Sequence, residues 1–425
     1  MKLKIVSYSI LKGGAAKAAR NFLYLFEKDL PSNLEVELIS VFGTEKNKKI
    51  NKASQLSVGY HYFKMLLSRF FTIFDRKNHV VKYSLNIFSS NYVIKKLELK
   101  SERKEIIHLN WINNDTISLF DLNKLFKNPN KKILLTLHDE WFYCASEHYA
   151  EYNSDSFMVG YPDEGCIGST IFKLKKNLDF NKVVISVPSE WLLERARKSY
   201  LLKHSDIHIL PNPIDTDVFN YHRDVRSNRY SILNVSEGSF IIGFGAVSGS
   251  SNPIKGFDLL VNSLRNVLTC SNNRSNIILL TFGAKDIDKR VESLGCKVIN
   301  MGFISSVKDM AQVYNYIDVM IVPSRAESFG QVAAESLSCQ TPVIAFEYSG
   351  LKDIITHQRN GLLAEPFSID SLTSNVEYFM SLSNEEREEY GVNGRRDIIN
   401  KFSKDVIAKK YSELLDYVKG AKNEQ

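Results

Sequence analysis

The sequence predicts an α/β fold made of two doubly wound parallel sheets. Two observations predict it: short β-rich apolar runs alternate with amphipathic helical stretches, and this alternation stops at one aperiodic segment and then begins again. Such alternation is typical of βαβ units around a parallel sheet. The chain has 425 residues, and because a domain usually holds about 100–200 residues, the length also favours two domains.

Residues 1–215 hold the first series of strands and helices. The apolar runs LKIVSYSI, IIHLNWI, KILLTLHD and KVVISVPS are predicted as strands, because strands buried on both faces read as continuous apolar runs. The stretches AAKAARNFLYLFEK and EWLLERARKS are predicted as helices. We expect these elements to form an N-terminal Rossmann-like domain.

Residues 216–235 interrupt the pattern, because prolines, asparagines, serines and charges replace any periodicity. We expect a linker there. In residues 236–400 the runs FIIGFGAV, NIILLTFGA, CKVINMGF, DVMIVPS and TPVIAF are predicted as strands of a second Rossmann-like domain. Residues 403–420 carry apolar side chains at helical spacing, and we expect this helix to complete the first domain.

Composition narrows the class of protein. A hydrophobic content of 44% with 24% charged residues describes a globular chain, and no apolar run is long enough to span a bilayer. The amino terminus does not resemble a signal peptide, and the five cysteines lack a C-x-x-C pair, which fits a reducing compartment. We therefore expect a cytoplasmic protein. The net charge of +7 fits an anionic membrane surface, a phosphorylated substrate or an ordinary solvated surface; no nucleic-acid partner is expected.

Residues 60–77 fit this scheme less well. Phe63, Leu66, Leu67, Phe70, Phe71 and Phe74 recur at helical spacing, and Lys64, Arg69, Arg76 and Lys77 lie beside or beyond them. Two interpretations remain open. The segment is a basic amphipathic helix that lies on the inner face of the plasma membrane, or it is a core helix whose cations extend to water.

Ligands of parallel α/β sheets bind at the carboxyl ends of the strands, where helix amino termini and glycine turns lie. In SRAESFGQVAAESLS, Glu327 falls in the loop after a strand and Glu335 in the next helix. The amides of Ser328, Phe329 and Gly330 lie between them and could bind a phosphate, while the carboxylates accept sugar hydroxyls. The alternative is that Glu327 is a surface charge and Glu335 a helix-dipole residue.

Four other positions could serve the same chemistry. Lys255 precedes a predicted helix and could neutralise a diphosphate, and Gly350 could add amides to the same anion site. Gly13 and Gly14 begin the first helix, and His138 ends the strand KILLTLH. His138 is either a buried structural residue or a group that contacts a sugar and stabilises developing charge. Cys144, His148 and Cys166 lack the spacing of a zinc site, so no metal is expected.

The motif ESFGQVAAESLSCQTPVIAFEYSGLKDII, followed by NGLLAEP, resembles the family-4 retaining glycosyltransferases of GT-B fold. HLNWI, LTLHDEW, PSEWLLERARKS and IKGFDLL are similar to the colanic-acid type of exopolysaccharide glycosyltransferase. The resemblance covers nearly the whole chain and implies two Rossmann-like domains that face a central cleft.

The resemblance also implies roles for the candidate residues. Glu327 would contact the donor sugar, Glu335 the nucleotide ribose and Lys255 the diphosphate. His138 would contact the sugar, and Gly13 and Gly14 would form an acceptor-side loop.

The sequence departs from the family pattern at several places, two of which concern the donor-side segments. Gly245-Ala246 stand where relatives carry a phosphate-binding arginine, which Arg325 could replace. Gln340 stands where relatives have glycine after the helix of Glu335, which predicts a strained left-handed residue.

The function expected from this resemblance is retaining transfer of a hexosyl group from a nucleotide-diphosphate sugar, either a UDP-sugar or a GDP-sugar. The acceptor would be a saccharide or lipid-linked saccharide of a cell-surface polysaccharide. Lys255 and helix amides would stabilise the leaving diphosphate without a metal or other cofactor. The alternatives are a nucleotide-sugar epimerase, a synthase with a soluble sugar acceptor and a non-catalytic nucleotide-sugar-binding scaffold. An oxidoreductase is disfavoured because the G-x-G-x-x-G fingerprint is missing.

Overall fold

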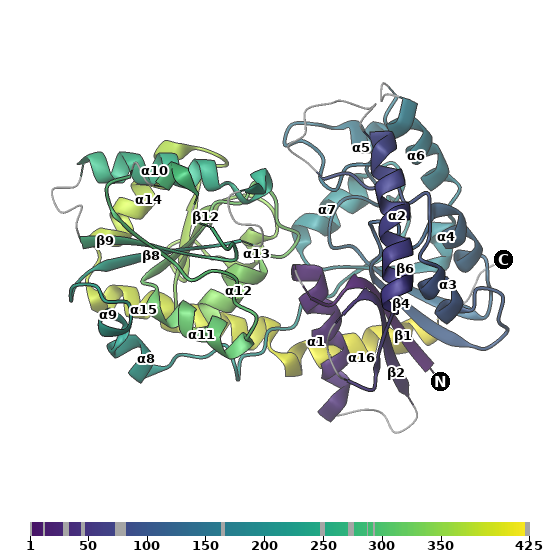
Figure 1. Cartoon of the computed structure of the whole chain (residues 1–425), viewed down its shortest axis with the longest axis horizontal. Coiled ribbons are helices and arrows are strands. Elements are labelled where there is room, and N and C mark those ends of the chain that lie inside the picture. The colour runs from purple at the N-terminus through teal and green to yellow at the C-terminus, as the bar shows by residue number, and fades with distance from the viewer. Residues whose placement is uncertain are drawn as a thin grey trace. The chain divides into compact units, whose positions relative to one another are not determined.

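A computed structural model of the chain describes residues 2–11, 13–28, 34–43, 47–72, 82–162, 166–246, 251–270, 276–286, 288–291 and 294–420. The chain divides into two compact units (Figure 1). Unit 1 comprises Met1–Pro213 with Ile407–Gln425, and unit 2 comprises Ile214–Val406. None of the helices in the described residues combines the length and hydropathy needed to cross a bilayer.

Unit 1 is built on a seven-stranded sheet in the order β3-β2-β1-β4-β5-β6-β7, whose neighbours all pair in parallel. Its strands are β1 (Lys2–Ser9), β2 (Glu35–Phe42), β3 (Ile50–Lys52), β4 (Glu105–Trp111), β5 (Lys131–Thr136), β6 (Val183–Val187) and β7 (Asp206–Ile209). Its helices are α1 (Gly14–Lys28), α2 (Gln55–Thr72), α3 (Asn91–Leu97), α4 (Leu119–Phe126), α5 (Ser156–Val159), α6 (Cys166–Lys176) and α7 (Glu190–Lys198). The strand order reverses between β1 and β4.

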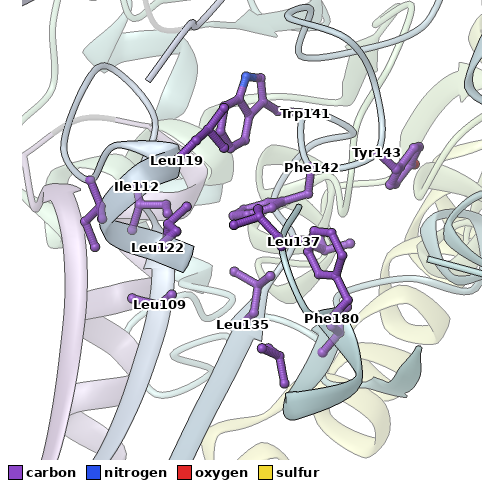
Figure 2. Close-up of a cluster of buried hydrophobic side chains, with 14 of the residues drawn as sticks. Leu109, Ile112, Leu119, Leu122, Leu135, Leu137, Trp141, Phe142, Tyr143 and Phe180 are labelled. Atoms are coloured by element: carbon purple, nitrogen blue, oxygen red, sulfur yellow. The ribbon is translucent and has the colours of Figure 1, made fainter. Parts of the chain in front are cut away.

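Both faces of this sheet are covered by apolar side chains. Figure 2 shows the core on one face, where Leu109 of β4 and Leu135 of β5 gather with Leu122 of α4 and with Phe142 and Phe180. On the other face, α1 lies beside the C-terminal helix α16 (Lys404–Gly420) (Figure 1), and the Phe22 and Tyr411 ring centroids are 4.8 Å apart. Tyr411 is fully buried, and its hydroxyl lies 2.6 Å from Nδ1 of His108.

One buried ion cluster lies at the amino ends of three strands of this sheet. Lys4 Nζ is 3.0 Å and Lys131 Nζ is 2.6 Å from the carboxylate of Glu105. Burial alone would raise the pKa of Glu105, but the hydrogen bonds from both lysines hold it below its ordinary value. A buried carboxylate is tolerated only with such partners. Because the cluster lies at the end of the sheet opposite to the usual ligand edge, its role is structural.

The helix α2 lies on unit 1 with its apolar side outward. It buries His61, Met65 and Ser68, and at about 100° per residue the opposite side carries exposed apolar residues. This surface, here called the α2 apolar face, consists of Leu56, Tyr60, Phe63, Leu66, Leu67, Phe70 and Phe71. The interpretation of residues 60–77 as a core helix is therefore wrong, because the predicted apolar stripe points away from the core. Phe74, Arg76 and Lys77 lie outside the described residues.

Unit 2 repeats the same topology with a six-stranded parallel sheet in the order β10-β9-β8-β11-β12-β13. Its strands are β8 (Phe240–Gly245), β9 (Ile277–Phe282), β10 (Lys297–Asn300), β11 (Val319–Val322), β12 (Val343–Phe346) and β13 (Gly361–Ala364). Its helices are α8 (Arg223–Ser227), α9 (Arg229–Ile232), α10 (Phe257–Cys270), α11 (Val307–Tyr316), α12 (Gln331–Ser338), α13 (Leu351–Ile354), α14 (Ile369–Ser381) and α15 (Asn384–Phe402). The predicted fold class, two doubly wound parallel sheets, is confirmed.

Residues 216–235 are part of unit 2 and not a linker. They form α8 and α9, and Phe219 and Leu233 are buried in the core of the unit. Arg226 and Arg229 both bind Asp318, at 3.1 and 2.8 Å. These long-range ion pairs fix a segment whose own sequence is aperiodic, and the division between the units falls earlier, after Pro213.

Candidate functional site

Three segments that follow strands meet at the carboxyl edge of the unit 2 sheet, where the strand order reverses between β8 and β11. Gly256 has φ +65°, and a Cβ there would lie 1.8 Å from the carbonyl oxygen of Pro323. A Cβ on Gly350 would lie 2.6 Å from the carbonyl oxygen of Ser328. These close approaches press the turn that carries Lys255 and the loop that carries Gly350 against the loop after β11. This edge is the usual ligand position in such sheets.

Lys255 and Glu327 form an ion pair at this edge. Lys255 Nζ lies 2.5 Å from Oε1 of Glu327, and the Ser324 hydroxyl donates to the same oxygen at 2.9 Å. The backbone N–H of Gly350 donates to the Glu327 carbonyl at 2.8 Å. Because both charged side chains are partly exposed, an anionic ligand could reach the ammonium and a hydroxyl could reach the carboxylate.

The loop ends at the amino terminus of α12. Phe329 is buried, with its ring centroid 5.3 Å from that of Phe402, and it anchors the loop. Gly330 is the N-cap residue at φ +106° and supplies no side chain to cap the helix. A Cβ at Gly330 would lie 2.8 Å from Leu351. The helix N–H groups and dipole are thus available to an anion next to Lys255.

Glu335 lies deeper than Glu327, with a relative exposure of 1%. Tyr314 donates its hydroxyl to Oε2 at 3.0 Å, and Gln331 donates its amide to Oε1 at 2.9 Å. Burial, and then the charge of Glu335, raise the pKa of Tyr314 well above its ordinary value. Each carboxylate oxygen carries two lone pairs, so a ribose hydroxyl could share an oxygen with either partner.

Arg325 is engaged by a residue that the sequence analysis did not identify. Its guanidinium forms two hydrogen bonds with Asp258 of α10, at 2.8 and 2.6 Å, and a third with the Pro253 carbonyl at 2.6 Å. The hydrogen bond from Arg325 lowers the pKa of Asp258. Arg325 therefore ties two of the loops together, and a phosphate would have to compete with Asp258 for it. In the sequence, the only local indication of this ion pair is the acidic residue Asp258 in IKGFDLL.

In unit 1, Asn110, which the sequence analysis did not identify, connects predicted residues at the corresponding point of strand reversal. The Asn110 amide donates to the Ala15 carbonyl at 2.8 Å, and its oxygen lies 2.9 Å from Nε2 of His138. Gly13 has φ +95° and Gly14 begins α1. Burial lowers the pKa of His138 to about 4, so the imidazole is neutral at neutral pH.

Asp139 holds a second polar cluster beside His138. Its Oδ2 lies 2.7 Å from Nδ1 of His148 and 2.9 Å from Nε1 of Trp111. Burial alone would raise the pKa of Asp139, but His148 and the hydrogen bonds lower it. The sequence analysis named His148 but not its partner Asp139, because nothing in the local pattern links the two positions.

Cys144 does not form a metal centre with the residues around it in the described part of the chain, where no three His, Cys, Asp or Glu residues converge on one point. It is fully buried, and burial raises the pKa of its thiol well above the ordinary value. The side chain of Cys166 lies outside the described residues.

Comparison with known sequences gives a family match within unit 2 and partial matches to individual proteins. Residues 243–397 match the family of glycosyl transferases group 1. An uncharacterized glycosyltransferase of Methanocaldococcus jannaschii is 33% identical over 163 residues, 36% of this chain and 40% of that protein. The capsular polysaccharide biosynthesis glycosyltransferase CapM of Staphylococcus aureus is 26% identical over 248 residues, 56% of this chain and 62% of that protein. The matches thus span less than two thirds of these two relatives.

Solved structures match over almost the whole chain. Sucrose-phosphate synthase from Thermosynechococcus elongatus superposes with a TM-score of 0.69 at 18% identity, covering 99% of this chain and 100% of that one. HepE of Anabaena in complex with UDP-glucose superposes with a TM-score of 0.64 at 15% identity, covering 98% and 100%. At these identities the likeness establishes the fold, which is of GT-B type.

Proposed function

We propose, from the premise that this chain is a group 1 glycosyltransferase of GT-B type, that it is a retaining family-4 enzyme that transfers a hexosyl group from a nucleotide-diphosphate sugar. The observation that carries the proposal is the Lys255–Glu327 pair beside the uncapped amino terminus of α12. It offers a cation and N–H donors to a diphosphate and a carboxylate acceptor to sugar hydroxyls within one set of loops.

UDP is the favoured nucleotide of the sugar donor. HepE, which has the same fold, was solved with UDP-glucose, and this supports a UDP-sugar over a GDP-sugar for the present chain. Glu335, behind the same loop, is the proposed ribose contact, and His138 is the proposed sugar contact from unit 1. In this assignment Glu327 exchanges its bond to Lys255 for one to the sugar, while Lys255 turns to the diphosphate.

The chemistry required of the site is stabilisation of a leaving diphosphate. Negative charge grows on that group as the glycosidic bond breaks, while the sugar acquires oxocarbenium character. Fixed donors directed at developing charge are the largest single source of rate enhancement in many enzymes. Lys255 and the first N–H groups of α12 would supply them without a metal or another cofactor, and the neutral His138 could support the sugar.

The proposed acceptor is a saccharide, or a lipid-linked saccharide, of a cell-surface polysaccharide. CapM, a capsular polysaccharide biosynthesis glycosyltransferase, supports this class, and the exposed α2 apolar face would place the enzyme on an anionic membrane surface. We therefore assign the protein to the inner face of the plasma membrane as a peripheral cytoplasmic enzyme. Colanic-acid-type specificity is the finer form of this proposal.

The first test is ligand-induced stabilisation of the purified chain by UDP, GDP, ADP and their sugars. A ligand at 100 times its Kd should add about 2.7 kcal/mol to the free energy of unfolding, so a bound nucleotide should raise Tm visibly. UDP and one UDP-sugar should do so for the wild type. Glu335→Ala should lose the response to the nucleoside diphosphate, whereas Glu327→Ala should keep it and lose only the extra shift that the sugar gives.

A turnover assay distinguishes the enzyme from its alternatives. With donor and a lipid-linked saccharide, NMR of the product should show the anomeric configuration of the donor. Donor alone should yield no epimer. If nucleotides bind and no acceptor from a panel of soluble and lipid-linked saccharides is ever glycosylated, the scaffold interpretation replaces this one.

A further inference from the structure

Gln331 is a polar side chain at the proposed donor site to which the proposed function gives no role. It is the first residue of α12, and Glu335, the proposed ribose contact, follows one turn later on the same side of the helix. Nε2 of Gln331 donates to Oε1 of Glu335 at 2.9 Å, and the Tyr314 hydroxyl donates to Oε2 at 3.0 Å. Two donors, one from α12 and one from α11, therefore hold this carboxylate.

The bond to Glu335 fixes the orientation of the Gln331 amide. An amide presents an NH2 donor on one side and a carbonyl acceptor on the other, and the two sides are assigned from the hydrogen bonds that they make. Only the NH2 side can face a carboxylate oxygen, because a carbonyl oxygen in its place would repel the carboxylate. The carbonyl oxygen Oε1 of Gln331 is therefore directed away from Glu335 and presents a second acceptor beside it.

This carbonyl oxygen is buried and lacks a donor. The Gln331 side chain is half-buried, and within the described part of the chain its Oε1 has no hydrogen-bond partner. Most buried polar atoms have a partner, because an unpaired one loses its hydration without compensation. A leucine or a methionine at this position would avoid that loss. An unpaired acceptor beside a ligand-binding carboxylate therefore indicates that the ligand supplies the donor.

The position of Gln331 narrows the identity of that donor. Gln331 begins α12, whose first N–H groups are the proposed diphosphate contact, and Glu335 lies one turn deeper. A nucleotide that extends from the diphosphate to Glu335 therefore places its ribose beside the Gln331 side chain. The ionised diphosphate has no hydrogen-bond donor, whereas the ribose has two neighbouring hydroxyls, each of which can donate. Two acceptors separated by the width of one amide group are complementary to such a diol.

We propose that Gln331 determines specificity for a ribonucleotide donor: its carbonyl oxygen accepts one of the two ribose hydroxyls while Glu335 accepts the other. A nucleotide that lacks either hydroxyl leaves one of these acceptors unpaired and binds more weakly. The same amide also positions Glu335 through its Nε2. The inference rests on the proposed function, because it concerns the nucleotide of the proposed donor.

The test is calorimetric titration of the full chain with UDP, 2′-deoxy-UDP and 3′-deoxy-UDP. The wild type should bind each deoxy form about tenfold more weakly than UDP, since one hydrogen bond typically contributes about that much affinity. Gln331→Met should bind UDP about tenfold more weakly than the wild type does. This variant should no longer distinguish UDP from one of the two deoxy forms. It should still distinguish UDP from the other form, which lacks the hydroxyl that Glu335 binds.

Tyr314→Phe is the matched control, because it removes the other donor to Glu335 and leaves the Gln331 carbonyl in place. It should weaken UDP binding and keep the preference for the hydroxyl that Gln331 binds. The inference would be overturned if Gln331→Met kept both preferences, or if the two variants changed the preferences equally. Equal affinity of the wild type for UDP and both deoxy forms would overturn it as well.

Failure of the proposed function would give a different result. A wild-type chain that binds none of UDP, GDP and ADP would overturn the donor assignment and this inference with it. GDP and ADP carry the same two hydroxyls, so if one of them binds in place of UDP, its deoxy forms decide the inference by the same comparison. Because Gln331 is half-buried, Gln331→Met should keep nearly the wild-type Tm without nucleotide.

Discussion

Two lysines of unit 2 form ion pairs of the same length in different settings. Lys255 Nζ lies 2.5 Å from Glu327, and Lys404 Nζ lies 2.5 Å from Asp215. All four side chains are partly exposed, so neither pair should add more than about 1 kcal/mol to stability. Only the first pair adjoins the amino terminus of α12, and the two positions therefore form a matched set for separating function from stability.

Lys255→Met should reduce the rate of sugar transfer by about 10²-fold or more, since one preorganised donor is typically worth 10²–10³ in rate. Lys404→Met should leave the rate within about twofold, because the Lys404 pair does not adjoin the amino terminus of α12. Both variants should unfold at nearly the wild-type temperature. The measurement is kcat/KM for donor beside Tm for each variant, and equal rates in the two variants would remove Lys255 from the diphosphate site.

Removal of divalent metal should leave activity unchanged. The reason is that Lys255 and the N–H groups of α12 place fixed positive charge where the diphosphate would lie. The measurement is the rate of transfer by protein dialysed against EDTA and assayed with EDTA in excess. Loss of activity that Mg²⁺ or Mn²⁺ restores would contradict the proposed diphosphate site.

Gln340 has the left-handed backbone that its sequence position predicts, with φ +58°. A non-glycine residue in this region is strained, by about 1 kcal/mol. Gln340→Gly should therefore raise the free energy of unfolding by up to about 1 kcal/mol, measured by urea denaturation. Gln340→Ala is the control, because it removes the side chain and keeps the Cβ. Equal effects of the two substitutions on the free energy of unfolding would mean that the Gln340 side chain, and not its backbone conformation, causes the destabilisation.

Among the elements, those whose periodicity is local were predictable. β1, β4, β5 and β6, and five of the six strands of unit 2, are continuous apolar runs in the sequence. β2, β3, β7 and β13 were not predicted, because β3, β7 and β13 are short and β2 (EVELISVF) was not distinguished from its surroundings. α8 and α9 were missed because pairs with Asp318, about 90 positions away, hold them in place.

The candidate site likewise contains some residues that the sequence predicts and others that it does not. The spacing of Glu327 and Glu335 around a glycine placed them at a strand end and in the following helix. Asp258 as a partner of Arg325, and the Asp139–His148–Trp111 cluster, depend on tertiary contacts between segments that show no common pattern. The sequence also did not determine which side of α2 is exposed, since an apolar stripe has the same spacing whether it faces a core or a membrane.

The attachment of α16 to unit 1 depends on a buried polar pair. Tyr411 meets Nδ1 of His108, whose Nε2 lies 2.7 Å from the Thr136 hydroxyl. Tyr411→Phe would leave the buried Nδ1 without a partner, so the free energy of unfolding should fall by about 1–3 kcal/mol. Urea denaturation measures this loss. Tyr417→Phe on the same helix, at a half-exposed position, should cost less than about 0.5 kcal/mol. If the two substitutions cost the same, the pair is not what anchors the helix.

At the scale of the whole molecule, acid should destabilise unit 1. Burial lowers the pKa of His61 and His138 to about 4 and that of His108 to about 3, whereas an unfolded histidine titrates near 6.5. Between these values the unfolded chain binds more protons. Stability is therefore lost as pH falls below about 6.5, by up to about 1.4 kcal/mol per histidine for each pH unit.

Tryptophan fluorescence can follow this transition selectively, because all three tryptophans, Trp111, Trp141 and Trp191, lie in unit 1. Urea midpoints from fluorescence should fall steadily between pH 6.5 and 4. His108→Gln should reduce the slope over this range. A midpoint that does not change between these pH values would contradict the lowered pKa values of the three histidines.

The return of the chain to unit 1 at Ile407 has a consequence for its synthesis. Ile407, Tyr411, Leu414, Leu415 and Val418 are buried against β1 and α1 in one core. A ribosome makes these residues only after it has made every residue of unit 2, whereas domains generally fold from the amino terminus during translation. Unit 2 is contiguous and can fold first, even though it is made second. Until α16 has been made, the nascent unit 1 therefore exposes the apolar surface of Phe22 and Leu23 that α16 later covers.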